Sequence, residues 1–324
     1  MRVLVTGGAG YIGSHMALVL LRAGHEVVVV DDLSSGHRDA VPAGGVFVEA
    51  SVSDRARMSD VLRVHGVEAI LHFAARIQVG ESVTDPRRYY EGNVAASIAL
   101  LDSALDAGVK RFVLSSTAAV YGDPVRVPID EDHPTSPINP YGDTKLAIER
   151  MLSAYGHAYG LRWAALRYFN AAGADVEAGL DERHDPETHL VPIVVDAALG
   201  RREAVTVFGN DYDTPDGTCV RDYIHVLDLC DAHLIALEHL ASGGEGGAFN
   251  LGTGEGHSVA QVIDVVRRVS GREVRVVYGP RRAGDSPRLV ASPERAARVL
   301  GWRARRVRLE DIVSDLWQVR SARP

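Results

Sequence analysis

The sequence predicts an α/β protein with a doubly wound parallel sheet, followed by a smaller mixed α/β region. In the first half, short apolar runs alternate with longer segments of helical composition, which is typical of a parallel sheet with helices on both faces. The runs are residues 3–6, 26–30, 46–49, 69–73, 111–115 and 163–168, and the helical segments include residues 12–23 and 94–107. Further along, residues 171–190 and 209–217 are rich in turn-forming types and are expected to be loops.

This change of pattern predicts two domains. Residues 1–169 are expected to form the doubly wound domain and residues 170–324 the smaller one. A strand at 248–252 and a helix at 259–270 are expected late in the chain. A segment at about 218–252 is expected to return to the first domain.

Composition excludes several classes of function. The net charge is −8, from 35 basic and 43 acidic residues, and no basic stripe is present, so nucleic acid is not an expected partner. The two cysteines, Cys219 and Cys230, lack metal-ligand spacing, so we expect no metal and a cytoplasmic location. No apolar stretch reaches the roughly 18 residues of a membrane span, and no membrane association is expected.

A glycine pattern lies between the first predicted strand and the first predicted helix. Gly7, Gly10 and Gly13 form G-x-x-G-x-x-G, with Tyr11 and Ile12 inside it. Glycines at this place let the backbone turn tightly and approach a pyrophosphate, and the helix N-terminus favours the anion. The pattern therefore predicts a Rossmann dinucleotide site.

The end of the second predicted strand indicates which dinucleotide binds. Asp31 follows Gly13 by 18 residues, where a carboxylate can accept hydrogen bonds from the ribose hydroxyls of the adenosine half. The same carboxylate would repel a 2′-phosphate, so NAD is favoured over NADP. Asp32 is a weaker candidate for the same role.

A second group of residues predicts proton transfer. Tyr141 and Lys145 are spaced i, i+4 at the start of a predicted helix, so they share one face. Lys145 and a positive nicotinamide ring would stabilise the phenolate of Tyr141, which could then accept a proton from a substrate hydroxyl. Ser115 and Thr117 lie at the carboxyl end of a predicted strand, where a hydroxyl can bridge Tyr141 and the substrate.

Beyond these patterns, the chain resembles the UDP-glucose (UDP-galactose) 4-epimerases of the extended short-chain dehydrogenase/reductase family over nearly its whole length. The resemblance rests on VTGGAGYIGSH at 5–15, HFAA at 72–75, VGES at 79–82, RYFN at 167–170, FGNDY at 208–212, VRDYIH at 220–225 and PRRAGD at 280–285. It implies a homodimer that binds NAD and a UDP-sugar. It also implies that the 4-hydroxyl is oxidised to a transient ketone and then reduced on the other face.

The resemblance also implies the site residues. The catalytic group would be Thr117, Tyr141 and Lys145. The cofactor residues would be Gly7, Gly10, Tyr11, Ile12, Gly13, Asp31, Asp32, Phe73, Ala74, Ala75, Asn93, Ser115, Tyr141, Lys145 and Tyr168. The substrate residues would be Thr117, Tyr141, Asn170, His189, Leu190, Phe208, Arg221, Arg282 and Asp285. Among these, Arg221 and Arg282 would hold the diphosphate, Asp285 the uridine ribose, and Phe208 would flank uracil.

Three departures from the family pattern leave alternatives open. Ser51 stands where relatives often have Asp at an adenine contact, and Ile77 where some have Lys, although Arg76 is adjacent. Leu289 replaces a Tyr that limits the sugar pocket in some relatives, so activity on UDP-GlcNAc or UDP-GalNAc is an alternative. UDP-glucuronate, UDP-pentose and a non-catalytic NAD-binding regulatory protein are further alternatives. A 4,6-dehydratase is disfavoured because two alanines, at 118 and 119, follow Thr117.

Overall fold

The computed structural model describes residues 1–282 and 284–323, and its contacts divide the chain into two units. Unit 1 comprises Met1–Gly122, Pro134–Arg167 and Cys230–Phe249, and unit 2 comprises Asp123–His133, Tyr168–Leu229 and Asn250–Pro324. The chain therefore passes between the units more than once.

Unit 1 is built on a seven-stranded sheet in the order β10-β6-β5-β4-β1-β2-β3. Its strands are β1 (Arg2–Thr6), β2 (Glu26–Asp31), β3 (Val46–Glu49), β4 (Ala69–His72), β5 (Arg111–Thr117), β6 (Arg162–Tyr168) and β10 (Gly247–Leu251). The chain runs outward from β1 to β3, then returns to β4 on the other side of β1, with parallel pairing in both directions. This is the doubly wound Rossmann topology, and it confirms the predicted fold class.

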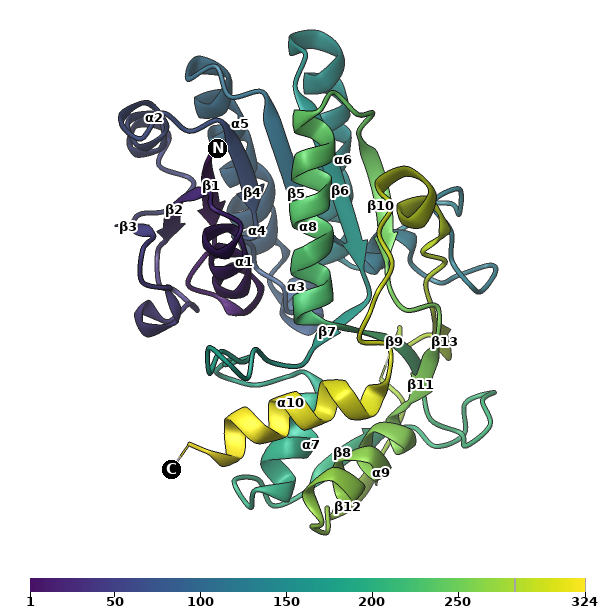
Figure 1. The fold of residues 1–324 in the computed structure, drawn as a ribbon. Helices are drawn as coiled ribbons and strands as arrows, with labels where there is room; N and C mark the ends of the chain where they lie inside the picture. Colours follow the sequence, from purple (N-terminus) through teal and green to yellow (C-terminus); the bar gives the residue numbers. More distant parts are fainter. Residues whose placement is uncertain (283, 324) are drawn as a thin grey trace. The chain divides into compact units, whose positions relative to one another are not determined.

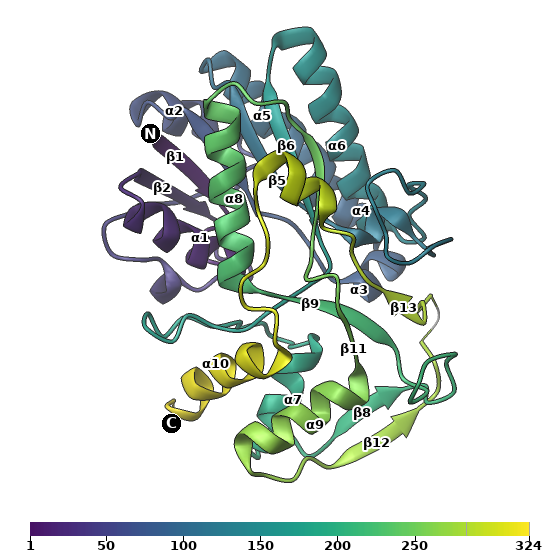
Figure 2. The same cartoon turned by 45° about the vertical axis from the view of Figure 1, so that its right-hand side comes forward.

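Helices cover both faces of this sheet. They are α1 (Tyr11–Arg22), α2 (Arg55–Val64), α3 (Val79–Thr84), α4 (Pro86–Tyr89), α5 (Ala96–Asp106), α6 (Pro140–Tyr159) and α8 (Val226–Ala241), with the short 3-10 helices η1 (Arg38–Ala40) and η3 (Ala118–Tyr121) and the π-helical segment η2 (Tyr90–Ala95). α2, α5 and α6 pack on one face, and α1 and α8 lie on the other (Figures 1 and 2). The central strands are thus buried on both faces, which explains their continuous apolar runs.

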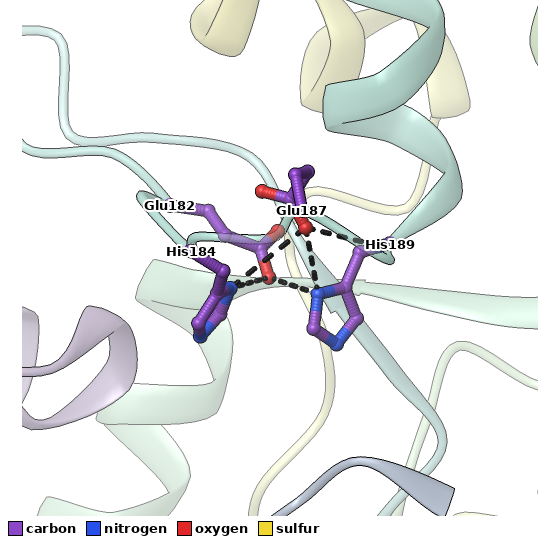
Figure 3. A group of neighbouring side chains, drawn as sticks. All are labelled: Glu182, His184, Glu187 and His189. Carbon is purple, nitrogen blue, oxygen red and sulfur yellow. Dashed lines mark hydrogen bonds and ion pairs between the residues drawn. The ribbon is translucent and has the colours of Figure 1, made fainter. Parts of the chain in front are cut away.

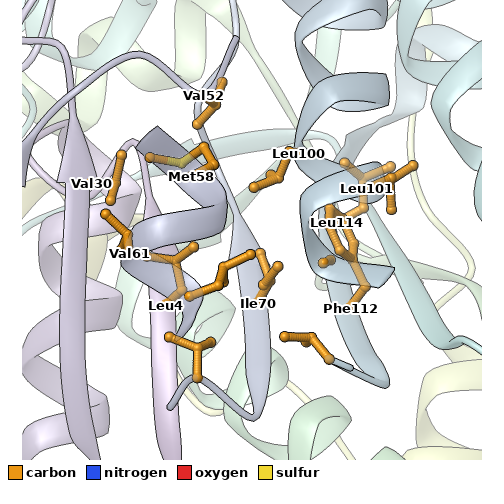
Figure 4. Packing of buried hydrophobic residues seen from close by; sticks show 14 of the residues in the cluster. Leu4, Val30, Val52, Met58, Val61, Ile70, Leu100, Leu101, Phe112 and Leu114 are labelled. Atoms are coloured by element: carbon orange, nitrogen blue, oxygen red, sulfur yellow. The ribbon is translucent and has the colours of Figure 1, made fainter. Parts of the chain in front are cut away.

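The core under α2 and α5 holds the strands in place. Leu4, Ile70 and Phe112 on the sheet pack with Met58 and Leu100 from the helices, and none of the five is exposed (Figure 4). Burying side chains of this size stabilises the fold by roughly 1.5–3 kcal/mol each. The carboxyl ends of β1, β4 and β5 are consequently anchored on a rigid base.

Unit 2 has a mixed α/β architecture, as predicted. Its central strand β9 (Val220–His225) pairs with β7 (Asn170–Ala172), β11 (Gly256–Ser258) and β13 (Arg288–Leu289), while β8 (Val205–Phe208) pairs with β12 (Val276–Gly279). Three helices, α7 (Leu190–Ala198), α9 (Val259–Ser270) and α10 (Leu309–Ser321), pack together over an apolar cluster, and η4 (Ala296–Leu300) is a short turn. Within the described ranges, no helix is both long and apolar enough to cross a membrane.

One expectation about local structure is corrected. Residues 171–190 are not a continuous loop, because β7 begins this stretch and pairs in parallel with β9. Three residues paired to a strand some fifty positions away carry no local pattern that would predict them. β5 ends at Thr117, so Ser115 and Thr117 lie at the carboxyl end of a strand, as predicted.

Candidate active site

The glycine loop has space for backbone only. Gly7 has a positive φ of 67°, and a Cβ there would lie 2.5 Å from the Ala74 nitrogen. A Cβ on Gly13 would lie 2.1 Å from the Gly7 oxygen, so α1 can approach the loop only through a glycine. Bare backbone therefore surrounds the N-terminus of a twelve-residue helix, which fits a pyrophosphate.

Asp31 is fixed beside this loop at the end of β2. Its Oδ2 accepts a hydrogen bond from the Ala9 nitrogen at 2.9 Å, and its Oδ1 accepts one from the Leu33 nitrogen at 2.8 Å. Burial raises the pKa of Asp31, while the two backbone hydrogen bonds oppose the increase. Asp32 is exposed and accepts a hydrogen bond from the Ser34 nitrogen. The structure thus orients the carboxylate of Asp31 at the place where the sequence predicted a ribose contact.

Thr117, Tyr141 and Lys145 meet in unit 1. Asn139 caps α6 by accepting a hydrogen bond from the Gly142 nitrogen at 2.9 Å, so the helix begins immediately before Tyr141. A Cβ on Gly142 would lie 2.5 Å from the Ala119 oxygen, so a glycine lets α6 approach the segment after β5. This approach brings the half-buried Tyr141 near Thr117.

Burial shifts the pKa values of both Tyr141 and Lys145, and Tyr141 can accept a proton only if a nearby cation stabilises its phenolate. Burial raises the pKa of Tyr141 to about 12, and the hydrogen bond with Thr117 works against that increase. Lys145 is 1% exposed, and its Nζ donates to the Ser115 oxygen at 2.8 Å. Burial lowers the pKa of Lys145 to about 8, against the attraction of Glu149. A buried ammonium one helical turn from Tyr141 lowers the free energy of its phenolate.

Sequence reasoning missed a buried polar network next to Lys145. Arg167 contacts the carboxylate of Glu149 at 2.5–3.2 Å, and it also donates to the Tyr121 hydroxyl at 2.9 Å. The Ser116 hydroxyl donates to Glu149 at 2.5 Å. Glu149 lies one turn beyond Lys145 on α6, so the spacing Tyr141-Lys145-Glu149 on one helix face was the available signal.

Asn93 holds the segment after β4 against α6. Its Oδ1 accepts from the Arg76 nitrogen at 2.8 Å, and its Nδ2 donates to the Arg76 oxygen and to the Thr144 hydroxyl, both at 3.1 Å. These three hydrogen bonds fix the backbone of Arg76 relative to α6. Residues 73–75, which were predicted to approach the cofactor, lie between the end of β4 and this fixed residue. Phe73 also stacks on His233, with ring centroids 4.8 Å apart.

The cost of burying Lys145 gives a prediction on stability. Its pKa of about 8 lies below the usual value near 10.4, so the unfolded chain binds more protons between these pH values and stability rises with pH there. Lys145→Met should therefore stabilise the cofactor-free chain by about 2–3 kcal/mol at pH 7, and this gain should disappear between pH 8 and 10.4. Urea unfolding at pH 7 and pH 10 measures it. A variant that is less stable than wild type at pH 7 would contradict the assignment of a strained ammonium.

In unit 2, four of the predicted substrate residues lie together. Asp285 is 2.9 Å from the Nε of Arg282 and 3.5 Å from the Nη2 of Arg221. The guanidinium of Arg282 lies over the ring of Phe208, 5.0 Å from its centroid. Two guanidinium groups, a carboxylate and an aromatic ring form a set that can bind phosphate oxygens, ribose hydroxyls and a flat base.

The residue after Arg221 on β9, Asp222, has a buried carboxylate that holds this strand in place. Asp222 accepts hydrogen bonds from the nitrogen and hydroxyl of Thr253, both at 2.8 Å, and from the nitrogens of Gly254 at 3.0 Å and Ala291 at 3.1 Å. Burial raises its pKa, against these hydrogen bonds. The sequence motif VRDYIH drew attention to Arg221 as a substrate residue. Its neighbour Asp222 has a different role, because it links β9 by hydrogen bonds to residues 253–254 and to residue 291.

The remaining predicted substrate residues occupy separate places in unit 2. Asn170 begins β7 in register with Tyr223, and Leu289 in β13 is in register with Arg221. Leu190 begins α7, and His189 precedes it. His189 contacts the carboxylates of Glu182 and Glu187. Two negative charges beside it are not explained by a role in binding a diphosphate, which is itself an anion.

The glycine loop at the switch point of a doubly wound sheet, followed by Thr117, Tyr141 and Lys145, defines an enzyme of the extended short-chain dehydrogenase/reductase class. Residues 3–252 match the model of the NAD dependent epimerase/dehydratase family, and the chain belongs to that family.

Similar proteins are known in sequence and in structure. The UDP-glucose 4-epimerase of Halalkalibacterium halodurans is 49% identical over 100% of this chain and 97% of its own length, and that of Rhizobium meliloti is 52% identical over 99% and 97%. The crystal structure of UDP-glucose 4-epimerase from Brucella ovis in complex with NAD is 48% identical, with a TM-score of 0.95 over 98% of both chains. The Bifidobacterium longum enzyme in complex with NAD⁺ and UDP is 35% identical, with a TM-score of 0.94 over 100% and 99%.

Proposed function

We propose that this chain is an NAD-dependent epimerase that interconverts UDP-glucose and UDP-galactose at C-4. The observation that carries the proposal is the buried Lys145, which lies one turn from Tyr141 on α6 and donates to the Ser115 oxygen at the end of β5, in the unit that holds the glycine loop. Relatives at about 50% identity over nearly the full length are UDP-glucose 4-epimerases. This supports the hexose reaction over the uronate, pentose and regulatory alternatives.

The cofactor assigned here is NAD. The absence of space for a Cβ at Gly7 and Gly13 fits a dinucleotide lying on the loop, and the oriented carboxylate of Asp31 fits an unphosphorylated ribose. The other residues proposed to line this site are Gly10, Tyr11, Ile12, Asp32, Phe73, Ala74, Ala75, Asn93, Ser115, Tyr141, Lys145 and Tyr168. Asn93 contributes indirectly, because its hydrogen bonds to Arg76 and Thr144 position the neighbouring residues of the site.

Each residue of the catalytic group then has one task. Bound NAD supplies an acceptor for the electron pair of the C-4 hydrogen and returns that pair, so no cofactor is consumed. The phenolate oxygen of Tyr141 accepts the proton of the 4-hydroxyl and later gives it back to the same oxygen. Thr117 holds the phenol and the sugar oxygen in line, and Lys145 keeps the phenolate accessible at neutral pH.

Substrate binding is assigned to unit 2 for the nucleotide part. Arg221 and Arg282 neutralise the diphosphate, Asp285 accepts from the uridine ribose, and Phe208 contacts the base. Asn170, His189 and Leu190 complete the set. Arg282 pairs with Asp285 at 2.9 Å, so binding of the ribose and the diphosphate would exchange part of that ion pair for contacts with the ligand.

Two further expectations belong to this proposal. A cytoplasmic location agrees with two buried cysteines, Cys219 and Cys230, that form no disulfide, since disulfides are rare in a reducing compartment. A homodimer is implied by the family resemblance. Sedimentation or light scattering of the purified protein tests the assembly.

A single assay tests the activity. Purified protein incubated with UDP-galactose and no added NAD should form UDP-glucose, because a cofactor that is regenerated in each cycle can remain bound. UDP-GlcNAc in the same assay tests whether Leu289, half-buried next to Arg221 in register, admits a 2-acetamido group. No conversion of UDP-galactose after NAD is added back would refute the epimerase proposal. No turnover of UDP-GlcNAc would restrict the enzyme to hexoses.

A further inference from the structure

Two glutamates and two histidines converge in the segment that precedes α7. Glu182, His184, Glu187 and His189 come from eight consecutive residues and point toward one another (Figure 3). The Nδ1 of His189 lies 2.8 Å from Glu182 Oε1 and 3.0 Å from Glu187 Oε1. The Nδ1 of His184 lies 3.1 Å and 3.8 Å from the same two oxygens. One ligand atom from each residue lies within 4.8 Å of all the others.

These spacings are close to those in the coordination shell of a tetrahedral metal ion. Nitrogen and oxygen ligands about 2.0–2.2 Å from a zinc ion are separated from one another by roughly 3.3–3.6 Å. Three of the four nitrogen-to-oxygen distances, 2.8, 3.0 and 3.1 Å, are shorter than that range and the fourth, 3.8 Å, is longer, so small side-chain shifts would bring the four atoms around one ion. Both histidines also present the same ring nitrogen, so the two rings can share one ion.

Burial and charge favour a cation over hydrogen bonds alone. The side chains of Glu182 and Glu187 are only 3% and 9% exposed, and within residues 1–282 and 284–323 neither Oε2 has a hydrogen-bond partner. The rings of His184 and His189 are 5.0 Å apart, so two imidazolium cations there would repel each other. One divalent ion with two neutral imidazoles and two carboxylates gives a neutral site.

The neighbouring groups orient these ligands. Glu187 Oε1 accepts from the backbone nitrogens of Thr188 and His189, both at 2.9 Å, which fixes its carboxylate. Arg320 also approaches the cluster: its Nη2 lies 3.7 Å from Glu187 Oε2, and its guanidinium is held by Asp181 and Asp196. Its charge is therefore directed mainly away from the two histidines.

We propose that Glu182, His184, Glu187 and His189 bind one divalent transition-metal ion, with zinc as the best match. The donor set of two imidazoles and two carboxylates suits zinc better than magnesium or calcium, which prefer oxygen ligands. The cysteine spacing predicted no metal, but this site uses no cysteine. A metal on Nδ1 of His189 would keep the proton on Nε2 and so make that nitrogen a donor at the start of α7.

Metal content tests the proposal directly. The full-length protein is stripped with a chelator, incubated with zinc, passed through a desalting column and analysed by mass spectrometry of elements. About one zinc per chain is expected. Cobalt loading adds a geometric readout, because tetrahedral cobalt absorbs strongly in the visible range and octahedral cobalt does not.

Variants that remove one ligand atom separate a site from incidental binding. Glu182→Gln and His184→Gln should each weaken zinc binding by at least about 10–100-fold, the loss typical of removing even an outer-shell partner. His157→Gln, on an exposed position of α6, is the matched control and should bind like wild type. Zinc should raise the melting temperature of the wild type and the control, but not that of the two variants. Zinc uptake that is far below one per chain, or equal in all four proteins, would overturn the proposal in favour of a purely hydrogen-bonded cluster.

Discussion

The Tyr141→Phe variant should lose roughly 10²–10⁴-fold of its turnover with UDP-galactose while retaining bound NAD. The substitution removes only the phenolic hydroxyl, which is the group proposed to accept the proton of the substrate. The ring and the start of α6 remain, so the glycine loop and Asp31 are not disturbed. Turnover is measured by coupled assay, and cofactor content by absorbance of the purified protein after denaturation.

A matched tyrosine on the same helix provides the control. Tyr155 donates a hydrogen bond to Asp102 at 3.0 Å, and it lies almost four turns beyond Tyr141. Tyr155→Phe should therefore keep its turnover within a factor of about two, since this part-buried hydrogen bond lies almost four turns from the proton acceptor and one neutral bond contributes little. Near-normal turnover in Tyr141→Phe, with the control also active, would show that another group accepts the proton.

The Asp222→Asn variant should lose about 3–5 kcal/mol of its free energy of unfolding. Asp222 is not exposed, and it accepts hydrogen bonds from Thr253, Gly254 and Ala291. An amide has one acceptor oxygen, so its NH₂ group would face backbone N–H groups that have lost their acceptor. The midpoint of urea unfolding measures the loss. Because Arg221 is adjacent on β9, KM for the UDP-sugar should increase as well.

An exposed aspartate gives the comparison for this variant. Asp264 on α9 pairs with Arg267 at the surface, at 3.2 Å, and its side chain is 66% exposed. Asp264→Asn should change the unfolding free energy by less than about 0.5 kcal/mol. If Asp222→Asn unfolds at the same urea concentration as Asp264→Asn, then Asp222 does not join the segments as described.

Much of unit 1 could be predicted because its signals are local. The apolar runs mark strands that are buried on both faces, and the glycines at 7, 10 and 13 mark a loop with no space for side chains. The i, i+4 spacing of Tyr141 and Lys145 likewise depends on α6 alone. Local patterns of this kind survive folding because the elements that carry them are continuous in the chain.

Features that depend on distant pairing were missed. Glu149 meets Arg167 only because α6 packs next to β6, and Asp222 meets Ala291 only because β9 lies beside the segment after β13. The cluster at 182–189 is close in sequence, but nothing in its composition showed that both carboxylates would be buried. Burial of charge is a property of the fold, and a single sequence does not display it.

The burial of Lys145 also bears on how long the enzyme survives. A chain without its dinucleotide keeps a buried ammonium whose pKa burial lowers, and it lacks the stabilisation that a bound ligand gives to the folded state. Proteases act on chains that open transiently, so molecules that have lost their cofactor are the preferred targets. Degradation would then remove the inactive fraction first, and the abundance of the enzyme would follow the supply of its dinucleotide.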